Sequence, residues 1–308
     1  GVPSPYNVDA YNPTDLYFLN CEFRGRWKWF SWHPTYDNYN VAAKNLFEIK
    51  HAKRVLLEAC VFHETGVDAQ AGYTTVFKTA SQYGGTQVRA DITQDVQMLD
   101  CLHYDCQGVW SVQGSPNPQS GIPNDRHHLI NCLFHTINKQ PNTASGYVTS
   151  IQNGSTNITV ERITHVLNGG DTPQGCITVS GGACNNIKMT DCLIPIGQYG
   201  IFGQGASAEG TAALDLKWGS YQFTRNALNR QATGARAPSQ AAASKYPAGN
   251  FFPVNETAID YVNLGGSSIT DFALKPSSPY YAAGANGAPL GCDIARLATR
   301  VAGVISPG

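Results

Sequence analysis

The sequence predicts an all-β protein, a right-handed parallel β-helix of about seven coils with a C-terminal capping segment. A short motif occurs seven times: apolar or β-branched residues, then Asn, Asp or Ala, then usually Cys, then another apolar pair. Its register positions are residues 21, 60, 101, 132, 162, 192 and 226, so the later steps are close to thirty residues. A period of that size is typical of stacked repeats. The copies resemble strands without helical spacing, and only 14% of residues are charged, which argues against a helical bundle.

The cysteines of the motif are expected to face the inside of the coil. Strands of neighbouring coils in a β-helix lie about 4.8 Å apart, so side chains at one register position stack on each other. We therefore predict a ladder of small packed thiols rather than metal ligands at Cys21, Cys60, Cys101, Cys132 and Cys192. Outside the ladder, Cys176 and Cys184 bracket a strand and a turn and could close a small disulfide loop.

The chain divides into three stretches. Residues 1–230 hold the coils, with an aromatic loop at 24–40. Residues 231–250 are low in complexity and are expected to be a flexible linker or loop. Residues 251–308 are expected to form a C-terminal cap that packs back on the solenoid and covers the last coil, because an uncapped end would expose unpaired strand edges.

Charge and hydropathy exclude two classes of partner. The 21 Lys and Arg residues are balanced by 22 Asp and Glu residues, so there is no basic surface for nucleic acid. No apolar run is long enough to span a membrane. Neither nucleic acid nor a membrane is therefore an expected partner.

The first candidate site is the aromatic loop, where three of the five tryptophans fall within six residues. Aromatic rings on a loop offer sugars an apolar face with a polar edge. The predicted substrate-binding residues are Trp27, Trp29, Trp32, His33, Tyr36 and Tyr39. The alternative is a packed flap that covers the side of the solenoid.

The second candidate site is a set of charged residues on the coils that follow. Glu48 shares the solvent face of one strand with Lys50, and Asp68 follows the next strand. Such carboxylates could act as acid and base, or could hold a Ca²⁺ ion. The alternative is a set of cross-strand ion pairs with Lys44, Lys50 and Lys78. No other cofactor and no further metal site is predicted.

The third candidate site lies on the next two coils. A polysaccharide lyase needs a base beside a cation that neutralises the sugar carboxylate. His103, Arg126 and His127 could supply both, which makes them candidate catalytic residues with Glu48 and Asp68. The alternative is that these are exposed polar loop residues.

Several segments resemble those of secreted bacterial β-helix repeat proteins of the pectate-lyase-like superfamily. They are residues 44–58, 67–72, 246–253 and 274–280, and the likeness covers about residues 15–295. The resemblance implies a location outside the cell or at its surface. The superfamily includes polysaccharide lyases, glycoside hydrolases, tailspikes and adhesins, so the fold does not choose the activity. The signature motifs of polygalacturonase-like hydrolases and the Trp-x-Asp-His block of pectate lyases are absent.

Two function classes follow. The first is an extracellular protein that binds a polysaccharide and could cleave it as a lyase or hydrolase. The second is a non-catalytic structural or surface solenoid, such as a tailspike-like, adhesin or virion subunit. The second would form a homo-oligomer, either a side-by-side trimer or an end-to-end stack.

Overall fold

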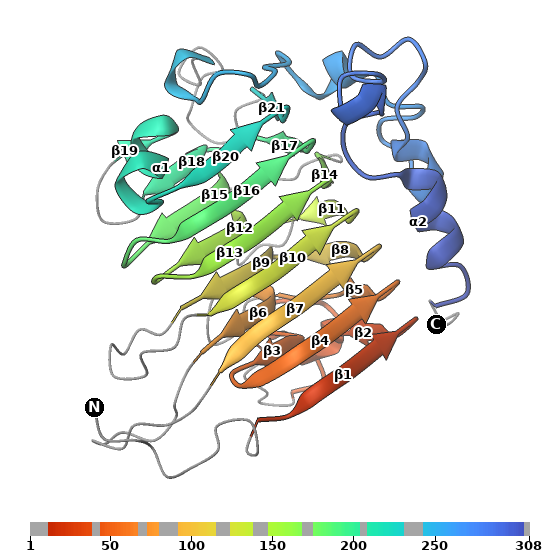
Figure 1. Cartoon of the computed structure of the whole chain (residues 1–308). Coiled ribbons are helices and arrows are strands. Elements are labelled where there is room, and N and C mark those ends of the chain that lie inside the picture. Colours follow the sequence, from red (N-terminus) through yellow and green to blue (C-terminus); the bar gives the residue numbers. More distant parts are fainter. Residues whose placement is uncertain are drawn as a thin grey trace, which may run out of the picture.

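The chain forms a parallel β-helix in which each of the first six coils contributes one strand to each of three sheets (Figure 1). The structure is a computed structural model. It describes residues 12–38, 44–66, 73–79, 92–114, 124–137, 147–167, 175–203, 208–230 and 243–304. From β1 to β18, strands three apart in the sequence are parallel neighbours within a sheet, as expected when every turn of the coil passes through all three sheets. After β18 the order changes, because β19 pairs antiparallel with β18, and β20 and β21 pair with β16 and β17. Inside the coil the stacked apolar rows form one continuous core.

Each of the three sheets has seven strands. Sheet A consists of β1 (Thr14–Leu19), β4 (Ala52–Glu58), β7 (Thr93–Leu99), β10 (Asp125–Ile130), β13 (Thr156–Glu161), β16 (Asn185–Thr190) and β20 (Tyr221–Thr224). Sheet B consists of β2 (Glu22–Arg24), β5 (Val61–His63), β8 (Leu102–Cys106), β11 (Leu133–Ile137), β14 (Thr164–Val166), β17 (Leu193–Pro195) and β21 (Ala227–Asn229). Sheet C consists of β3 (Phe47–Ile49), β6 (Tyr73–Lys78), β9 (Gly108–Gln113), β12 (Tyr147–Gln152), β15 (Gly175–Ser180), β18 (Ile201–Gly203) and β19 (Ala208–Glu209).

The repeated motif marks the corner between sheet A and sheet B. The residue before each ladder position has a left-handed backbone with φ between 52° and 60°. Asn and Asp adopt this conformation more readily than other non-glycine residues, which explains the motif. The corner residues are Asn20, Ala59, Asp100, Asn131, Arg162, Asp191 and Arg225. We call this row the corner ladder.

The thiol ladder is confirmed, with one correction. Strand register stacks Cys21, Cys60, Cys101 and Cys132 on successive coils. On the fifth coil the ladder residue is Ile163, because Leu133 pairs with Thr164. The prediction that Arg162 holds that position was wrong by one residue, since Arg162 is the corner residue and Ile163 fills the buried place.

The ladder thiols have a second role at the corner. Each of the five donates to the backbone carbonyl two residues earlier, at 3.2–3.5 Å. A thiol is therefore both a small core side chain and a partner for a corner carbonyl.

All nine cysteines of the chain are free thiols, including Cys176 and Cys184. We expect a thiol titration of the denatured, non-reduced protein to find nine reactive groups per chain. The same titration after reduction is the control. A count lower by two before reduction would contradict the structure at Cys176 and Cys184.

The C-terminal segment covers one side of the solenoid. Residues 246–253 lie on the last coil, where Phe251 N donates to Asn226 O at 2.8 Å. The later residues, 254–304, run back along the outer face of sheet B from the last coil to the first (Figure 1). We call residues 254–304 the strap. Its helical elements are η5 (Glu256–Ile259), η6 (Ile269–Phe272), η7 (Ala285–Gly287) and α2 (Ile294–Arg300).

The strap covers the side of sheet B, and not only the end of the coil, because the outward row of that sheet is apolar. Its side chains pack with strap residues such as Ile259, Tyr261, Phe272 and Leu297 in a second core. The row consists of Val61, Leu102, Leu133, Leu193 and Ala227.

Polar contacts fix the strap to the coils, one coil after another. Gly291 N donates to Asp191 O at 2.8 Å. Cys292 N donates to Thr164 Oγ1 at 2.8 Å, and Asp293 N donates to Asn131 Oδ1 at 2.6 Å. The contacts on the first three coils are those of Arg296 with Asp100, Arg300 with Glu58, and Asn20 with the carbonyl of Arg300. The corner ladder is thus the main docking row for the strap.

The predicted linker, residues 231–250, is described in its second part only. Residues 231–242 lie outside the described part of the chain. Residues 243–250 contain η4 (Ala243–Lys245) and the buried Tyr246, whose hydroxyl donates to Glu209 Oε1 at 2.9 Å. Nearby, α1 (Thr211–Lys217) packs on β18 and β15. Among the described residues, no helix is long and apolar enough to cross a membrane.

Candidate functional site

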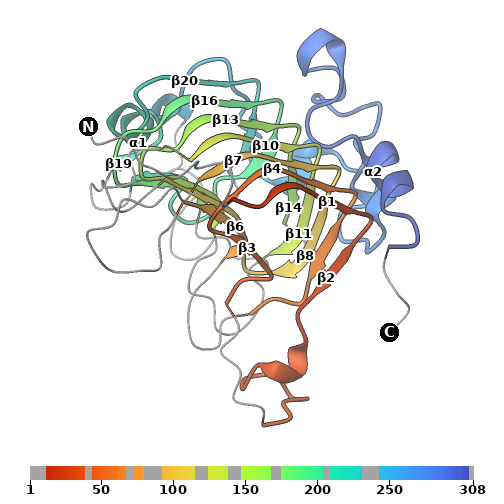
Figure 2. The same ribbon diagram turned by 60° about the horizontal axis from the view of Figure 1, so that its bottom comes forward.

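The aromatic loop forms a compact cluster of rings outside the coil. It follows β2 and contains η2 (Trp27–Trp29), the orange turn that projects from the first coil in Figure 2. Trp27 stacks on His33 with ring centroids 5.5 Å apart, and Trp32 stacks on Phe30 at the same distance. Trp27 and Trp32 meet edge to face at 5.7 Å. The rings therefore hold one another in place, as aromatic pairs do beyond simple burial.

The loop is anchored to the coil at its base. Phe30 is only 2% exposed. A side chain at Gly66 would place its Cβ 2.6 Å from Trp32 Cζ2, so the loop needs glycine there. Lys28 and Asp37 close the loop with an ion pair of 3.0 Å.

The three tryptophans of the loop form neither a fully exposed sugar platform nor a buried flap on the side of the solenoid. Trp27, Trp29 and Trp32 are all half-buried, as are His33 and Tyr36, so ring surface remains open to solvent. Tyr39 lies outside the described residues. The loop is a self-packed cluster with exposed ring faces, not a flap lying flat on the sheet.

A group of ionisable side chains lies beside the aromatic loop on the outer face of sheet B. Register places Arg24, His63 and Tyr104 next to each other on the first three coils. His63 Nε2 is 2.7 Å from Glu22 Oε1, and Arg24 Nε donates to Glu64 Oε1 at 2.9 Å. We call these five residues the sheet B polar cluster. Gly25 joins it to the loop, because any Cβ there would lie 1.9 Å from the carbonyl oxygen of Glu64.

The histidine is the deepest member of the cluster. His63 is 3% exposed and stacks on Tyr104 with ring centroids 4.7 Å apart. Its Nδ1 has no hydrogen-bond partner and lies 3.7 Å from Glu64 Oε1. Burial, together with the charges of Asp105, Glu22 and Glu64, raises the pKa of Tyr104 to about 12. The phenol therefore stays protonated and can donate a hydrogen bond at neutral pH.

The chemistry of the sheet B polar cluster favours binding of a ligand over catalysis. A histidine oriented by a carboxylate is the arrangement of a general base. Here, however, the ring is covered by Tyr104, and Glu64 is occupied by Arg24. The charged groups that reach solvent are the side chains of Arg24 and Glu22, with exposed fractions of 44% and 20%. They offer a hydrogen-bond donor and an acceptor next to exposed rings.

Of the predicted carboxylate pair, one member can be placed. Glu48 lies on β3 and pairs with Lys78 at 2.9 Å and Lys50 at 3.9 Å. Burial opposes ionisation, but the hydrogen bond from Lys78 and the nearby charges outweigh it, so the pKa of Glu48 is lowered. Asp68 lies outside the described residues, so its pairing with Glu48 and a shared Ca²⁺ ion stay predictions. Within the described ranges, no three His, Cys, Asp or Glu residues form a metal site.

The predicted group of His103, Arg126 and His127 is not assembled. His103 faces into the coil, where its ring stacks on Phe62 at 4.5 Å. His127 also faces inward and contacts Asn124. Both are fully buried, and burial lowers the pKa of each to about 3. A substrate outside the coil would not reach either ring, so we leave both out of the site proposed below.

Arg126 lies on the same strand as His127, β10, but on the outer face of sheet A. It points outward from sheet A and binds Asp95 of the preceding coil through two hydrogen bonds of 2.5 and 2.9 Å. Arg54 on the second coil binds Asp15 on the first coil in the same way. These are cross-strand ion pairs between adjacent coils. Arg126 therefore already neutralises a carboxylate of the protein.

The sequence reasoning missed four members of the polar cluster: Glu22, Arg24, His63 and Tyr104. A signal existed. Arg24, His63 and Tyr104 each follow a ladder cysteine by three residues, so alignment of the repeats would have placed them in one outward row. Comparison with known proteins gives no further guide, because no family model, no curated protein and no solved structure matches this chain.

Proposed function

We propose that this chain is an extracellular carbohydrate-binding protein whose binding surface is the aromatic loop together with the sheet B polar cluster. The observation that carries the proposal is the half-exposed ring cluster of Trp27, Trp32 and His33, fixed beside the exposed Arg24. Sugar rings combine apolar faces with polar edges, so they need this pairing of flat rings and polar groups.

Preorganisation supports the proposal. The rings stack on each other, and Lys28 with Asp37 closes the loop. A ligand would therefore not have to order these side chains, which reduces the entropy cost of binding. Arg24 could bind a sugar carboxylate or hydroxyl, so both acidic and neutral glycans are candidates.

The proposed function is glycan binding, and glycan cleavage is a separate question. Within the sheet B polar cluster, His63 is buried and Glu64 is paired with Arg24, so the cluster does not present an exposed acid and base side by side. Cleavage by a lyase or hydrolase is the extension of the proposal. It is checked by incubating the intact protein with each glycan that it binds and analysing the products for unsaturated or new reducing ends.

Replacement of Trp27 by Ala should weaken glycan binding by about five- to thirty-fold, since stacking on an aromatic ring is worth roughly 1–2 kcal/mol. A glycan array identifies the ligand, and calorimetry then measures its affinity. Tyr199→Ala is the control, because Tyr199 is a solvent-exposed aromatic residue on a distant coil. Unchanged affinity in Trp27→Ala, with an unchanged melting temperature, would rule out the aromatic loop as the binding surface.

A second candidate function is assembly through the first coil. Among the strands that the structure describes, β1, β2 and β3 are each the edge of their sheet. The inward residues Leu16 and Phe18 are only half-buried there, and Tyr17 is 64% exposed. An open coil end with apolar side chains favours stacking on a second copy, as in a structural solenoid. A monomeric mass by light scattering at high protein concentration would contradict this candidate.

A further inference from the structure

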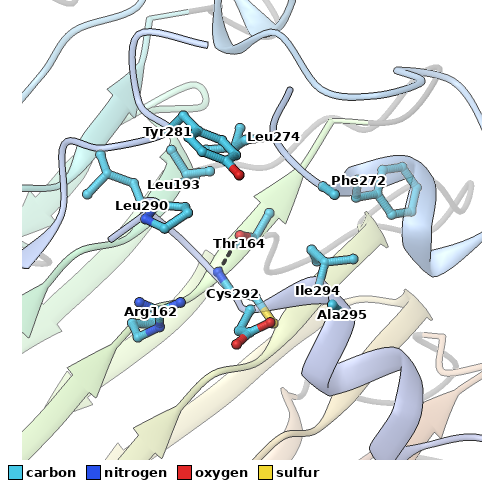
Figure 3. Close-up of a pocket in the computed structure, with 13 residues that line it drawn as sticks. Arg162, Thr164, Leu193, Phe272, Leu274, Tyr281, Leu290, Cys292, Ile294 and Ala295 are labelled. Atoms are coloured by element: carbon cyan, nitrogen blue, oxygen red, sulfur yellow. Dashed lines mark hydrogen bonds between the residues drawn. The ribbon is translucent and has the colours of Figure 1, made fainter. Parts of the chain in front are cut away.

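A pocket of about 270 Å³ opens between the strap and sheet B at the level of the fifth and sixth coils (Figure 3). Its sheet side is formed by Arg162, Thr164 and Leu193, and its strap side includes Leu274, Tyr281 and Leu290. The volume is close to the lower bound of roughly 300 Å³ for small-molecule sites. The pocket lies on the C-terminal half of the solenoid, away from the aromatic loop of the first coil.

Arg162 is the exceptional member of the corner ladder. The acidic corner residues before and after it are paired: Asp100 with Arg296, and Asp191 with Arg225, both at 2.7–2.8 Å. The backbone N of Arg162 donates to Thr190 O at 3.2 Å, but its guanidinium has no ion pair or hydrogen bond within the described part of the chain. A half-buried guanidinium without an anion is a ready site for one, since it presents a planar set of donors.

The other polar groups of the pocket can donate hydrogen bonds to a ligand that carries acceptor oxygens. Thr164 is 1% exposed, and its Oγ1 accepts from Cys292 N, so its hydroxyl proton remains available. The hydroxyl of Tyr281 points into the pocket in Figure 3. The one acidic side chain of the lining, Asp293, already accepts a hydrogen bond from Arg296 N at 3.0 Å at the start of α2.

The remaining walls are apolar. They consist mainly of Leu193, Phe272, Leu274, Leu290 and Ile294. A ligand rich in hydroxyl groups would leave those groups without partners against such walls, which is costly. A flat or branched apolar body would instead gain from burial.

We propose that this pocket binds a small organic carboxylate with a compact apolar body. The carboxylate pairs with the guanidinium of Arg162, and the apolar body packs between Leu193 and the leucines of the strap. The site is separate from the glycan surface proposed above, and neither proposal depends on the other.

The test uses the intact chain and benzoate as the probe, with affinity measured by calorimetry. Benzoate should bind at least tenfold more tightly than benzamide, which has the same shape without the charge, because hydrogen bonds to charged groups are the stronger ones. It should also bind more tightly than galacturonate, whose hydroxyl groups the apolar walls cannot satisfy. Equal affinity for benzoate and benzamide overturns the role of the charge, and tighter binding of galacturonate overturns the apolar body.

Variants then assign the site. R162Q should weaken benzoate binding about tenfold or more, and R162K, which keeps the charge but loses the planar fork, should lie between R162Q and the parent. K217Q is the matched control, because it removes the charge of one half-buried cation from α1, outside the pocket. Arg162 has no partner to lose, so R162Q should melt like the parent. If R162Q and K217Q bind benzoate equally well, the proposal fails.

Discussion

The free energy of unfolding should fall steeply as the pH is lowered from 6.5 towards 3. Three histidines point into the core, and burial lowers their pKa values from 6.5 to about 3: His103, His127 and His165. In the unfolded chain they take up protons below pH 6.5, whereas in the folded chain they stay neutral until about pH 3. The unfolded state therefore binds more protons throughout this range, and acid favours it.

The expected effect is large. Each such histidine costs about 1.4 kcal/mol per pH unit in this window, so three cost about 4 kcal/mol per unit. Since domain stability is roughly 5–15 kcal/mol, we expect unfolding between roughly pH 5 and pH 3. Urea unfolding followed by circular dichroism at a series of pH values measures the slope. Paired carboxylates such as Asp95 have lowered pKa values. Their protonation also lowers the free energy of unfolding, but only when the pH falls below the usual pKa of Asp.

His103→Phe isolates one of the three contributions. The neighbours of His103 on the coils before and after are Phe62 and Phe134, so phenylalanine continues an existing ladder. Neither ring nitrogen of His103 has a hydrogen-bond partner to lose. The variant should be more stable by about 2 kcal/mol at pH 5. About a quarter of the pH slope from the buried histidines should be lost, since burial also lowers the pKa of His135, to about 4. His51→Phe, at an exposed position, is the control. An unchanged pH slope in His103→Phe would show that His103 is not the buried neutral group described here.

Replacement of Leu297 by Ala should lower the free energy of unfolding by about 2–5 kcal/mol. Leu297 is fully buried on α2 and packs in the core between the strap and sheet B. The matched control is Leu216→Ala, which changes a 54% exposed leucine in a helix of the same length, α1. We expect the control to change stability by less than about 0.5 kcal/mol.

The same pair of variants tests whether the strap and the coils unfold together. If they form one cooperative unit, Leu297→Ala lowers the single unfolding transition. A separate early transition in Leu297→Ala, with the main transition unchanged, would show that the strap unfolds independently of the coils.

The fold could be predicted from the sequence because its signal is local and repeated. Asn or Asp followed by Cys encodes a left-handed corner and a small buried side chain, and this recurs on most coils. The fifth coil was misplaced by one residue because its copy of the motif has no cysteine, so Arg162 was aligned with the cysteines of the other coils. The observed steps from Cys132 to Ile163 and on to Cys192 are unequal, since loop length varies between coils.

The path of the strap and the candidate sites could not be predicted as well. The strap contacts join residues up to 280 positions apart, such as Ala285 to Asp191 and Asn20 to Arg300, and nothing local in the sequence marks them. His103 was taken as an outward polar residue because it was considered alone. Alignment with Phe62 and Phe134 would have shown that its row faces the core. The pocket around Arg162 depends on both the strap and the one-residue register shift.

The route of the strap also has a consequence for synthesis of the chain on the ribosome. Val61 packs in the core that Val301 completes, yet the two are translated 240 residues apart. At a translation rate of roughly 5–20 residues per second, the outward face of sheet B stays uncovered for about ten to fifty seconds before the strap is synthesised. During that time the nascent chain presents a stacked row of Val, Leu and Ala side chains to the surrounding medium. Translation arrested before α2 would make that exposure permanent, so incomplete chains should aggregate far more readily than finished ones.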